Sequence, residues 1–183
     1  MILATLACAV AVAAAGATPG KEALDYGFRF ASSLDRDLKD KAKAQQEVVL
    51  EYPAIGLLDE AVRRAEHVEG WRRGAVYADL ATLLGQQGRK DDARALMARA
   101  AEVRQATTGW EGPRISAHLA QSHASLGEVE ASERLAGDLA RNDSRQYEGR
   151  STATAAAAHA AHGEFAQAMA LLAPLDAQAD FEV

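Results

Sequence analysis

The stretch Tyr77-Ala-Asp-Leu-Ala-Thr-Leu-Leu-Gly-Gln-Gln-Gly88-Arg-Lys-Asp-Asp-Ala93-Arg-Ala-Leu-Met97-Ala-Arg-Ala100 decides the fold of this chain. Apolar residues recur every three or four positions on both sides of Gly88, which is the pattern of two amphipathic helices joined by a tight turn. They are Tyr77, Leu80, Ala81 and Leu84 before the glycine and Ala93, Leu96, Met97 and Ala100 after it. Two short helices cannot bury such stripes alone, but stacked copies can, so the stretch predicts a helical repeat.

Weaker copies of this stretch lie on both sides of it. Four glycines, Gly56, Gly88, Gly127 and Gly163, are separated by 32, 39 and 36 residues. Mostly small residues stand seven positions before each glycine (Val49, Ala81, Ala120, Ala156) and five positions after it (Ala61, Ala93, Ser132, Ala168). Small side chains at fixed positions let helix axes approach closely. The chain is therefore predicted to be all-α, with about four antiparallel helix pairs over residues 48–178, a helical cap over residues 18–47 and a tail at 179–183.

One large aromatic residue precedes each of the last three glycines. Trp71, Trp110 and Tyr147 lie 17, 17 and 16 residues upstream of their glycines, each beside a Gly or an Arg. An aromatic side chain at the start of each first helix is expected to cover the seam between neighbouring repeats. The alternative is a row of rings on which a ligand stacks.

These positions resemble the tetratricopeptide repeat. The best copy, with Ala81, Leu84, Gly88, Ala93, Met97 and Ala100, matches the small and large positions of that motif one by one, and Gly163 to Leu172 is the other close match. The resemblance covers residues 49–175. It implies a right-handed α-solenoid whose first helices line a concave groove for a peptide or protein partner.

Composition agrees with closely packed helices. Apolar residues make up 49% of the 183 residues, only 5% is aromatic, and much of the apolar remainder is alanine, which favours helix over sheet. The length fits one domain. The net charge is −6 and no long basic run occurs, so a nucleic-acid partner is not expected.

The first 17 residues form an almost unbroken run of small and apolar side chains that ends in Ala15-Gly16-Ala17. This run predicts a secretory signal peptide cleaved near Ala17 and a periplasmic or secreted protein, although no Lys or Arg precedes it. No membrane span is expected after cleavage. Cys8, the single cysteine, is interpreted as a small apolar residue of this segment rather than a lipoprotein site.

Acidic residues follow each turn glycine. Because they recur in the first turn of each second helix, where a negative charge faces the positive end of the helix dipole, we interpret them as helix-start residues and not as catalytic carboxylates. They are Asp59, Glu60, Asp91, Asp92, Glu128, Glu130 and Glu164. No motif of a nucleotide-binding loop, a hydrolase elbow or a metalloprotease occurs. The chain is therefore expected to be neither an enzyme nor a cofactor carrier.

Histidines offer an alternative function. His123 and His159 occupy the same repeat position, and His159 and His162 share one helix face. If stacking brought these three together, they could bind a metal ion or another small ligand. The simpler interpretation is that they are polar residues at a partly buried helix interface.

The leading prediction is a non-enzymatic scaffold that docks a protein or peptide on the inward face of the first helices. That face is expected to be lined by short side chains such as Ala75 and Ala78. The proposed partner-binding residues are Arg73, Thr82, Gln86, Arg114, Gln121 and Arg150. The opposing interpretation is that the alanines only favour helix and the arginines are solvated. A third possibility is a structural subunit that assembles end to end through apolar surface at Phe181 or at the cap formed by residues 21–34.

Overall fold

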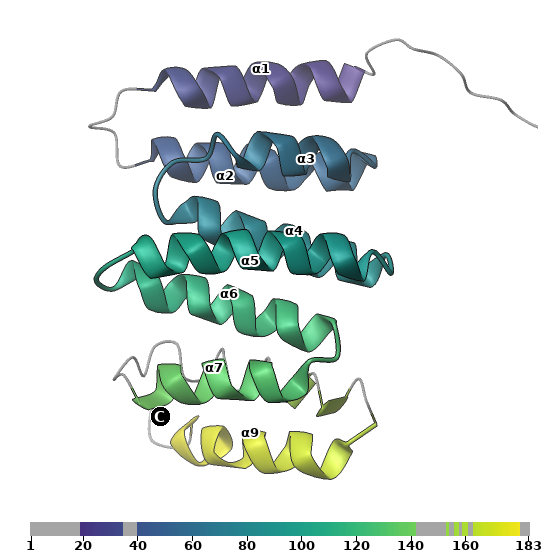
Figure 1. The fold of residues 1–183 in the computed structure, drawn as a ribbon, viewed down its shortest axis with the longest axis vertical. Coiled ribbons are helices and arrows are strands. Elements are labelled where there is room, and N and C mark those ends of the chain that lie inside the picture. The colour runs from purple at the N-terminus through teal and green to yellow at the C-terminus, as the bar shows by residue number, and fades with distance from the viewer. Residues whose placement is uncertain are drawn as a thin grey trace, which may run out of the picture.

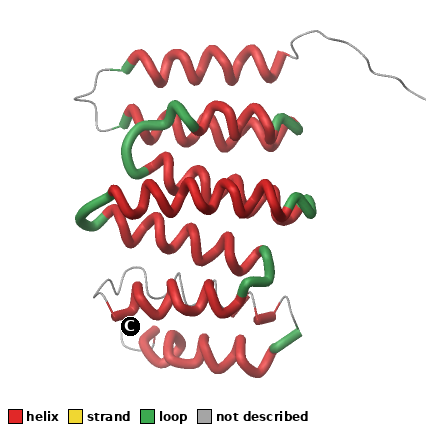
Figure 2. Tube along the Cα trace, in the orientation of Figure 1, coloured by secondary structure: helices red, strands yellow, loops and turns green. Residues whose placement is uncertain are grey.

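The computed structural model describes residues 19–34, 40–141, 153, 156–157, 159–160 and 163–179. Every regular element in this part of the chain is helical (Figures 1 and 2). The elements are α1 (Pro19–Ser33), α2 (Lys41–Glu51), the 3-10 helix η1 (Tyr52–Ile55), α3 (Leu58–Ala65), α4 (Arg72–Gln86), α5 (Lys90–Ala106), α6 (Glu111–Ser125), α7 (Val129–Arg141) and α9 (Phe165–Ala179). The predicted all-α class is confirmed. No helix among the described residues has both the length and the hydropathy of a membrane span.

The four turn glycines end the first helix of each pair in the same way. Gly56, Gly88, Gly127 and Gly163 have φ between +77° and +78°, a left-handed conformation that a side chain disfavours. In each turn, the N–H after the glycine donates to the carbonyl four residues before it. The bonds are Leu57 to Tyr52 (3.0 Å), Arg89 to Leu84 (2.9 Å), Glu128 to His123 (2.9 Å) and Glu164 to His159 (2.9 Å). Four glycines at similar spacing therefore encode four equivalent helix reversals.

The helix pairs stack in chain order from α1 at one end of the molecule to α9 at the other (Figure 1). We call α2, α4 and α6 the A helices and α3, α5, α7 and α9 the B helices. Neighbouring A helices pack directly, α4 against both α2 and α6, whereas the backbones of α3 and α5 do not pack against each other. Closer packing in one layer makes a stack concave on that layer, so the A helices lie on its inner side. The right-handed twist and the division of the chain at residues 17, 47 and 178 stay predictions.

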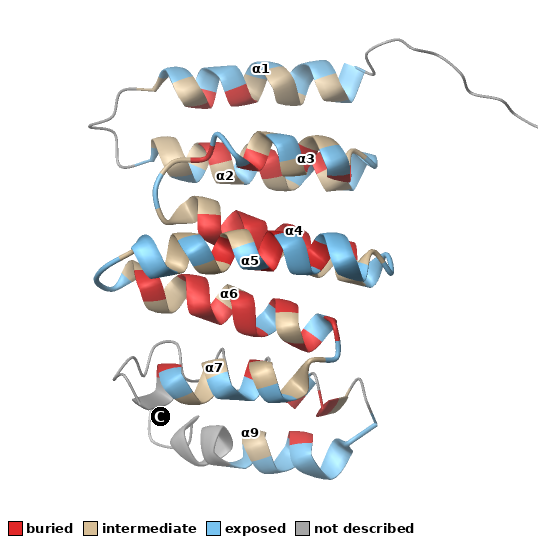
Figure 3. Cartoon of the chain, viewed as in Figure 1, coloured by how far each residue is buried: buried red, intermediate tan, exposed pale blue. Residues whose placement is uncertain are grey.

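The core follows the line of the stack (Figure 3). The small residues that recur around each turn glycine are buried: Ala61, Ala81, Ala93, Ala120 and Ser132 have no exposed surface, and Ala156 and Ala168 keep 2% and 6%. Ser132 stands where the other three repeats have alanine. Its Oγ is the one buried side-chain polar atom, among the residues that the structure describes, without a hydrogen-bond partner.

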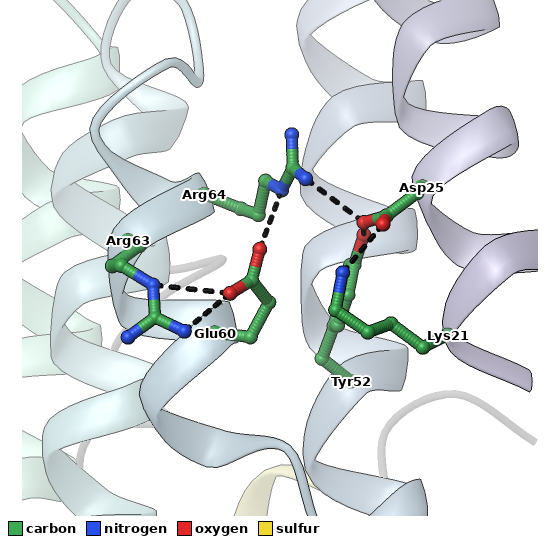
Figure 4. Close-up of polar contacts among 6 residues, drawn as sticks. All are labelled: Lys21, Asp25, Tyr52, Glu60, Arg63 and Arg64. Atoms are coloured by element: carbon green, nitrogen blue, oxygen red, sulfur yellow. Dashed lines mark hydrogen bonds and ion pairs between the residues drawn. The ribbon is translucent and has the colours of Figure 1, made fainter. Parts of the chain in front are cut away.

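Helix α1 closes the first repeat through a polar network (Figure 4). Asp25 accepts hydrogen bonds from the Tyr52 hydroxyl at 2.6 Å, Lys21 Nζ at 2.5 Å and Arg64 Nη2 at 2.9 Å. Arg64 Nε also donates to Glu60 at 3.0 Å. Burial alone would raise the pKa of Asp25, but the hydrogen bonds and the two positive charges outweigh it and hold that pKa below its usual value. The network fixes α1 against η1 and α3.

Candidate docking surface on the A helices

The two tryptophans lie at the same end of neighbouring A helices. Trp71 is the N-cap residue of α4 and Trp110 that of α6. Each follows a glycine with positive φ, Gly70 at +62° and Gly109 at +89°, where the chain turns from a B helix into the next A helix. The ring centroids are 6.1 Å apart and the ring planes are inclined at 66°, an edge-to-face arrangement. The recurring Gly-Trp dipeptide thus builds an aromatic contact between repeats.

Two arginines interleave with these rings. The Arg72 guanidinium lies 4.7 Å from the Trp71 centroid, and that of Arg114 lies 5.5 Å from Trp71 and 4.5 Å from Trp110. These distances are within the range of cation–π attraction. Arg72 Nη1 also donates to Gln46 Oε1 of α2 at 2.7 Å. We call Arg72, Trp71, Arg114 and Trp110 the Trp–Arg ladder, which spans α4 and α6 and reaches α2.

The ladder brings two positive charges together in an acidic protein. Burial lowers the pKa of Arg72, and the nearby charge of Arg114 lowers it further, while Glu47 and Asp40 act in the opposite direction. Guanidinium groups are hydrogen-bond donors whose geometry suits a carboxylate, so the ladder offers the chemistry that an acidic ligand uses.

The exposure of the two rings differs. Trp71 packs against the hydrophobic core and is only partly exposed, as expected of a residue that covers a seam. Trp110 keeps 59% of its surface exposed. The seam interpretation fits Trp71, while a row of rings on which a ligand stacks stays a prediction. Tyr147 lies outside the described residues.

The predicted partner-binding residues do not form one surface. Arg114 belongs to the ladder, Gln86 and Gln121 are exposed on α4 and α6, and Arg73 is partly buried with its charge acting on Tyr77. Thr82 Oγ1 meets Ser122 Oγ at 3.2 Å in the seam between α4 and α6. Arg150 lies outside the described residues.

The expectation that short side chains line an open face was wrong for Ala75 and Ala78. Both are fully buried. Ser122 Oγ of α6 donates to the Ala78 carbonyl of α4 at 2.7 Å, so this part of α4 forms the seam with the next A helix. On α4 and α6 the exposed side chains are Gln86, Gln121 and Ser125, near the ends of the two helices, because close packing of α4 against α6 covers the middle of the face.

The histidines bind carboxylates. His123 Nδ1 lies 2.8 Å from Glu128, and His159 lies 2.5 Å from Glu164 and 2.7 Å from Glu133 of the preceding helix. The hydrogen bonds to Glu164 and Glu133 raise the pKa of His159. In the described part of the chain, no group of three or more His, Cys, Asp or Glu side chains is placed to bind a metal ion. His162 lies outside that part.

The acidic residues after the turn glycines lie at helix starts, as expected, with Asp59 and Glu60 in the first turn of α3 and Asp91 and Asp92 in that of α5. The N-cap residues of these two helices, Leu57 and Arg89, make no capping side-chain hydrogen bond. Instead, arginines link acids of neighbouring repeats, which the sequence reasoning missed. The links are Arg89 to Asp59 at 2.7 Å, Arg94 to Glu128 at 2.8 Å and Arg99 to Glu66 at 3.1 Å. Their separations of 30 to 34 residues, close to one repeat, were the available signal.

Comparison with known proteins identifies the central helix pair. Residues 73–113, which run from α4 through α5 into the start of α6, match the family model of the tetratricopeptide repeat. No curated protein and no solved structure matches the chain. The protein is an α-helical repeat protein. Its central helix pair matches the tetratricopeptide repeat, so the predicted resemblance to this repeat family is confirmed over these residues.

Proposed function

We propose that this protein is a non-enzymatic docking scaffold, exported from the cytoplasm, that holds an acidic peptide or protein segment on the Trp–Arg ladder. The observation that carries the proposal is the arrangement of Arg72 and Arg114 around two tryptophan rings, one of them exposed. Trp and Arg are the residue types that dominate binding energy at protein interfaces.

Each part of the ladder has a role toward such a segment. A partner carboxylate would accept hydrogen bonds from the guanidinium groups of Arg72 and Arg114. An apolar or aromatic side chain of the partner would pack on the exposed face of Trp110. Gln86 and Gln121, exposed further along the same two helices, can donate to and accept from a partner's backbone.

The test is affinity capture from the native envelope with mass spectrometry of the captured proteins. With Trp110→Ala or Arg114→Glu, the enrichment of specific partners is expected to fall by at least about tenfold. Ile55→Ala, an exposed apolar residue on η1, and Lys90→Glu, an exposed cation on α5, are the controls and are expected to keep those partners. Unchanged capture by both ladder variants, with helical circular dichroism intact, would contradict the proposal.

The export part of the proposal rests on residues 1–17, which lie outside the described residues. Its support is the apolar run that ends in Ala15-Gly16-Ala17. Mass spectrometry of the mature chain from a periplasmic or culture-medium fraction is expected to give an N-terminus at Thr18. A chain that begins at Met1 and stays in the cytoplasmic fraction would contradict export.

A second candidate function, end-to-end assembly, is favoured by apolar side chains on both terminal helices. Tyr26 and Phe30 on α1 are 64% and 59% exposed, and Phe165 and Met169 on α9 are 67% and 65% exposed. An open stack of repeats leaves such faces uncovered unless a neighbour packs on them. Light scattering over a range of concentrations tests this candidate. The mass is expected to rise with concentration for the natural chain and to stay monomeric for Phe30→Glu.

A further inference from the structure

A cleft separates two B helices on the outer side of the stack, away from the ladder. The backbones of α3 and α5 do not pack against each other, and two ion pairs bridge the gap: Arg89, the N-cap of α5, to Asp59 at 2.7 Å and Arg99 to Glu66, the C-cap of α3, at 3.1 Å. The cleft between them has a volume of about 550 Å³. This lies in the range that small-ligand sites occupy in proteins, roughly 300–1,000 Å³.

Apolar atoms supply most of the surface of the cleft, although five of its nine lining residues are charged. Val62 of α3, Ala95 and Leu96 of α5, and Leu84 of α4 contribute apolar side chains to it, and Leu84 and Leu96 are buried. Apolar surface combined with placed polar groups is typical of sites that bind small organic molecules.

The lining of the cleft carries more positive than negative side chains. Arg89 donates to Asp59 of α3 at 2.7 Å and to Asp92 of α5 at 2.8 Å, so one guanidinium binds both carboxylates that line the cleft. Arg63 and Arg99 also line it, so a carboxylate brought by a ligand would meet three arginines and two carboxylates on the wall.

Arg99 offers unused donors to such a carboxylate. Its guanidinium stacks on the buried Tyr77 ring at 4.4 Å, and its Nη2 donates to the Tyr77 hydroxyl at 2.7 Å and to Glu66 at 3.1 Å. Its Nε and Nη1 have no acceptor among the described residues. The guanidinium is thus held in place before a ligand arrives, so little side-chain entropy is lost on binding.

We propose that the outer cleft binds a carboxylate with an apolar body, which fills the space beside Val62 and Leu96 while its carboxylate accepts hydrogen bonds from Arg99. This chemistry is shared by free aliphatic or aryl acids and by a peptide C-terminus that follows an apolar residue. The site is separate from the Trp–Arg ladder and does not depend on it.

The test is a nuclear magnetic resonance titration of the ¹⁵N-labelled full chain with two acid and amide pairs. The first pair is 4-phenylbutyrate and 4-phenylbutyramide, and the second is N-acetyl-Ala-Leu with a free carboxylate and the same dipeptide as its amide. Each acid that binds is expected to shift the amide signals of Val62 and Leu96 and the Arg99 Nε–H signal. Its Kd is expected to be at least about tenfold lower than that of the corresponding amide. The tighter of the two acids identifies the source of the carboxylate.

Two variants locate the binding. Ala95→Phe fills the cleft without removing any hydrogen bond and is expected to abolish the shifts, whereas Ala98→Phe, the same change at an exposed position of α5 outside the cleft, keeps them. Circular dichroism verifies that both variants remain folded. The proposal is overturned if neither acid shifts these signals, if the amides bind as well as the acids, or if Ala95→Phe binds like the natural chain.

Discussion

Ser132→Ala is expected to stabilise this protein. Ser132 has no exposed surface, its hydroxyl has no hydrogen-bond partner, and the equivalent positions in the other repeats, Ala61, Ala93 and Ala168, carry a methyl group. An unsatisfied buried polar group costs about 1–3 kcal/mol. Alanine also favours helix over serine by up to about 0.7 kcal/mol. Because part of the hydroxyl's packing is lost on its removal, we expect a net gain of about 1–2 kcal/mol in the free energy of unfolding.

Urea denaturation followed by circular dichroism measures this gain directly. In a chain of this size, 1 kcal/mol corresponds to about 2–4 °C in Tm, so thermal unfolding is expected to shift upward by about 2–8 °C. The matched control is Ser122→Ala, because Ser122 is equally buried but donates to the Ala78 carbonyl at 2.7 Å. Loss of that bond is expected to lower stability by about 1 kcal/mol.

The reasoning predicts opposite signs for the same substitution at two buried positions. If Ser132→Ala and Ser122→Ala both destabilise by similar amounts, the hydroxyl of Ser132 contributes to the folded state and its lack of a partner is not a cost. Ala93→Ser, the reciprocal change in the central repeat, is expected to lose stability and checks the argument from the other direction.

Three further predictions concern the turns, the cap and pH. Gly88→Ala is expected to lower the free energy of unfolding, measured by urea denaturation, by about 1 kcal/mol. The φ of Gly88 is +78° and no atom lies close enough to clash with an added Cβ, so only backbone strain acts. Gly88→Asn is expected to lower the free energy of unfolding by less. Asp25→Ala is expected to lower the free energy of unfolding by about 2 kcal/mol, because Tyr52 and Arg64 lose a hydrogen-bond acceptor. Glu22 is an exposed acid on the same helix, and Glu22→Ala is expected to change the free energy of unfolding by less than about 0.5 kcal/mol in the same assay. The pKa of His159 is raised above its ordinary value of 6.5. Protonated His159 therefore contributes fully to the stability of the folded state below pH 6.5, and this contribution is lost as the pH rises through the raised pKa. Urea midpoints measured between pH 6 and 9 are expected to fall for the natural chain and to fall less for His159→Gln.

The sequence predicted the helices closely where its signals were local. The helix from Arg72 to Gln86 and its partner from Lys90 to Ala106 follow from apolar spacing and from Gly88, since a residue with positive φ stops a helix wherever it occurs. Gly56, Gly127 and Gly163 predicted the turns of the other repeats in the same way.

The candidate site was predicted only in part. The register of Trp71 and Trp110 was visible as a spacing, and Arg114 was proposed as a binding residue. Arg72 was not, because its role depends on a ring contact and on the charge of a residue 42 positions away. Thr82 was assigned to an open face but lies in the seam with Ser122, since the closeness of α4 and α6 sets which side of α4 is covered.

The sequence alone determined what each helix pair is, because turn geometry and helix formation are decided within a few neighbouring residues. It therefore determined the all-α class and the repeat. Only the tertiary structure decided how successive pairs sit against one another: close between A helices, open between α3 and α5. That spacing depends on side chains about one repeat apart and creates both the Trp–Arg ladder and the outer cleft, so neither surface can be read from any single repeat.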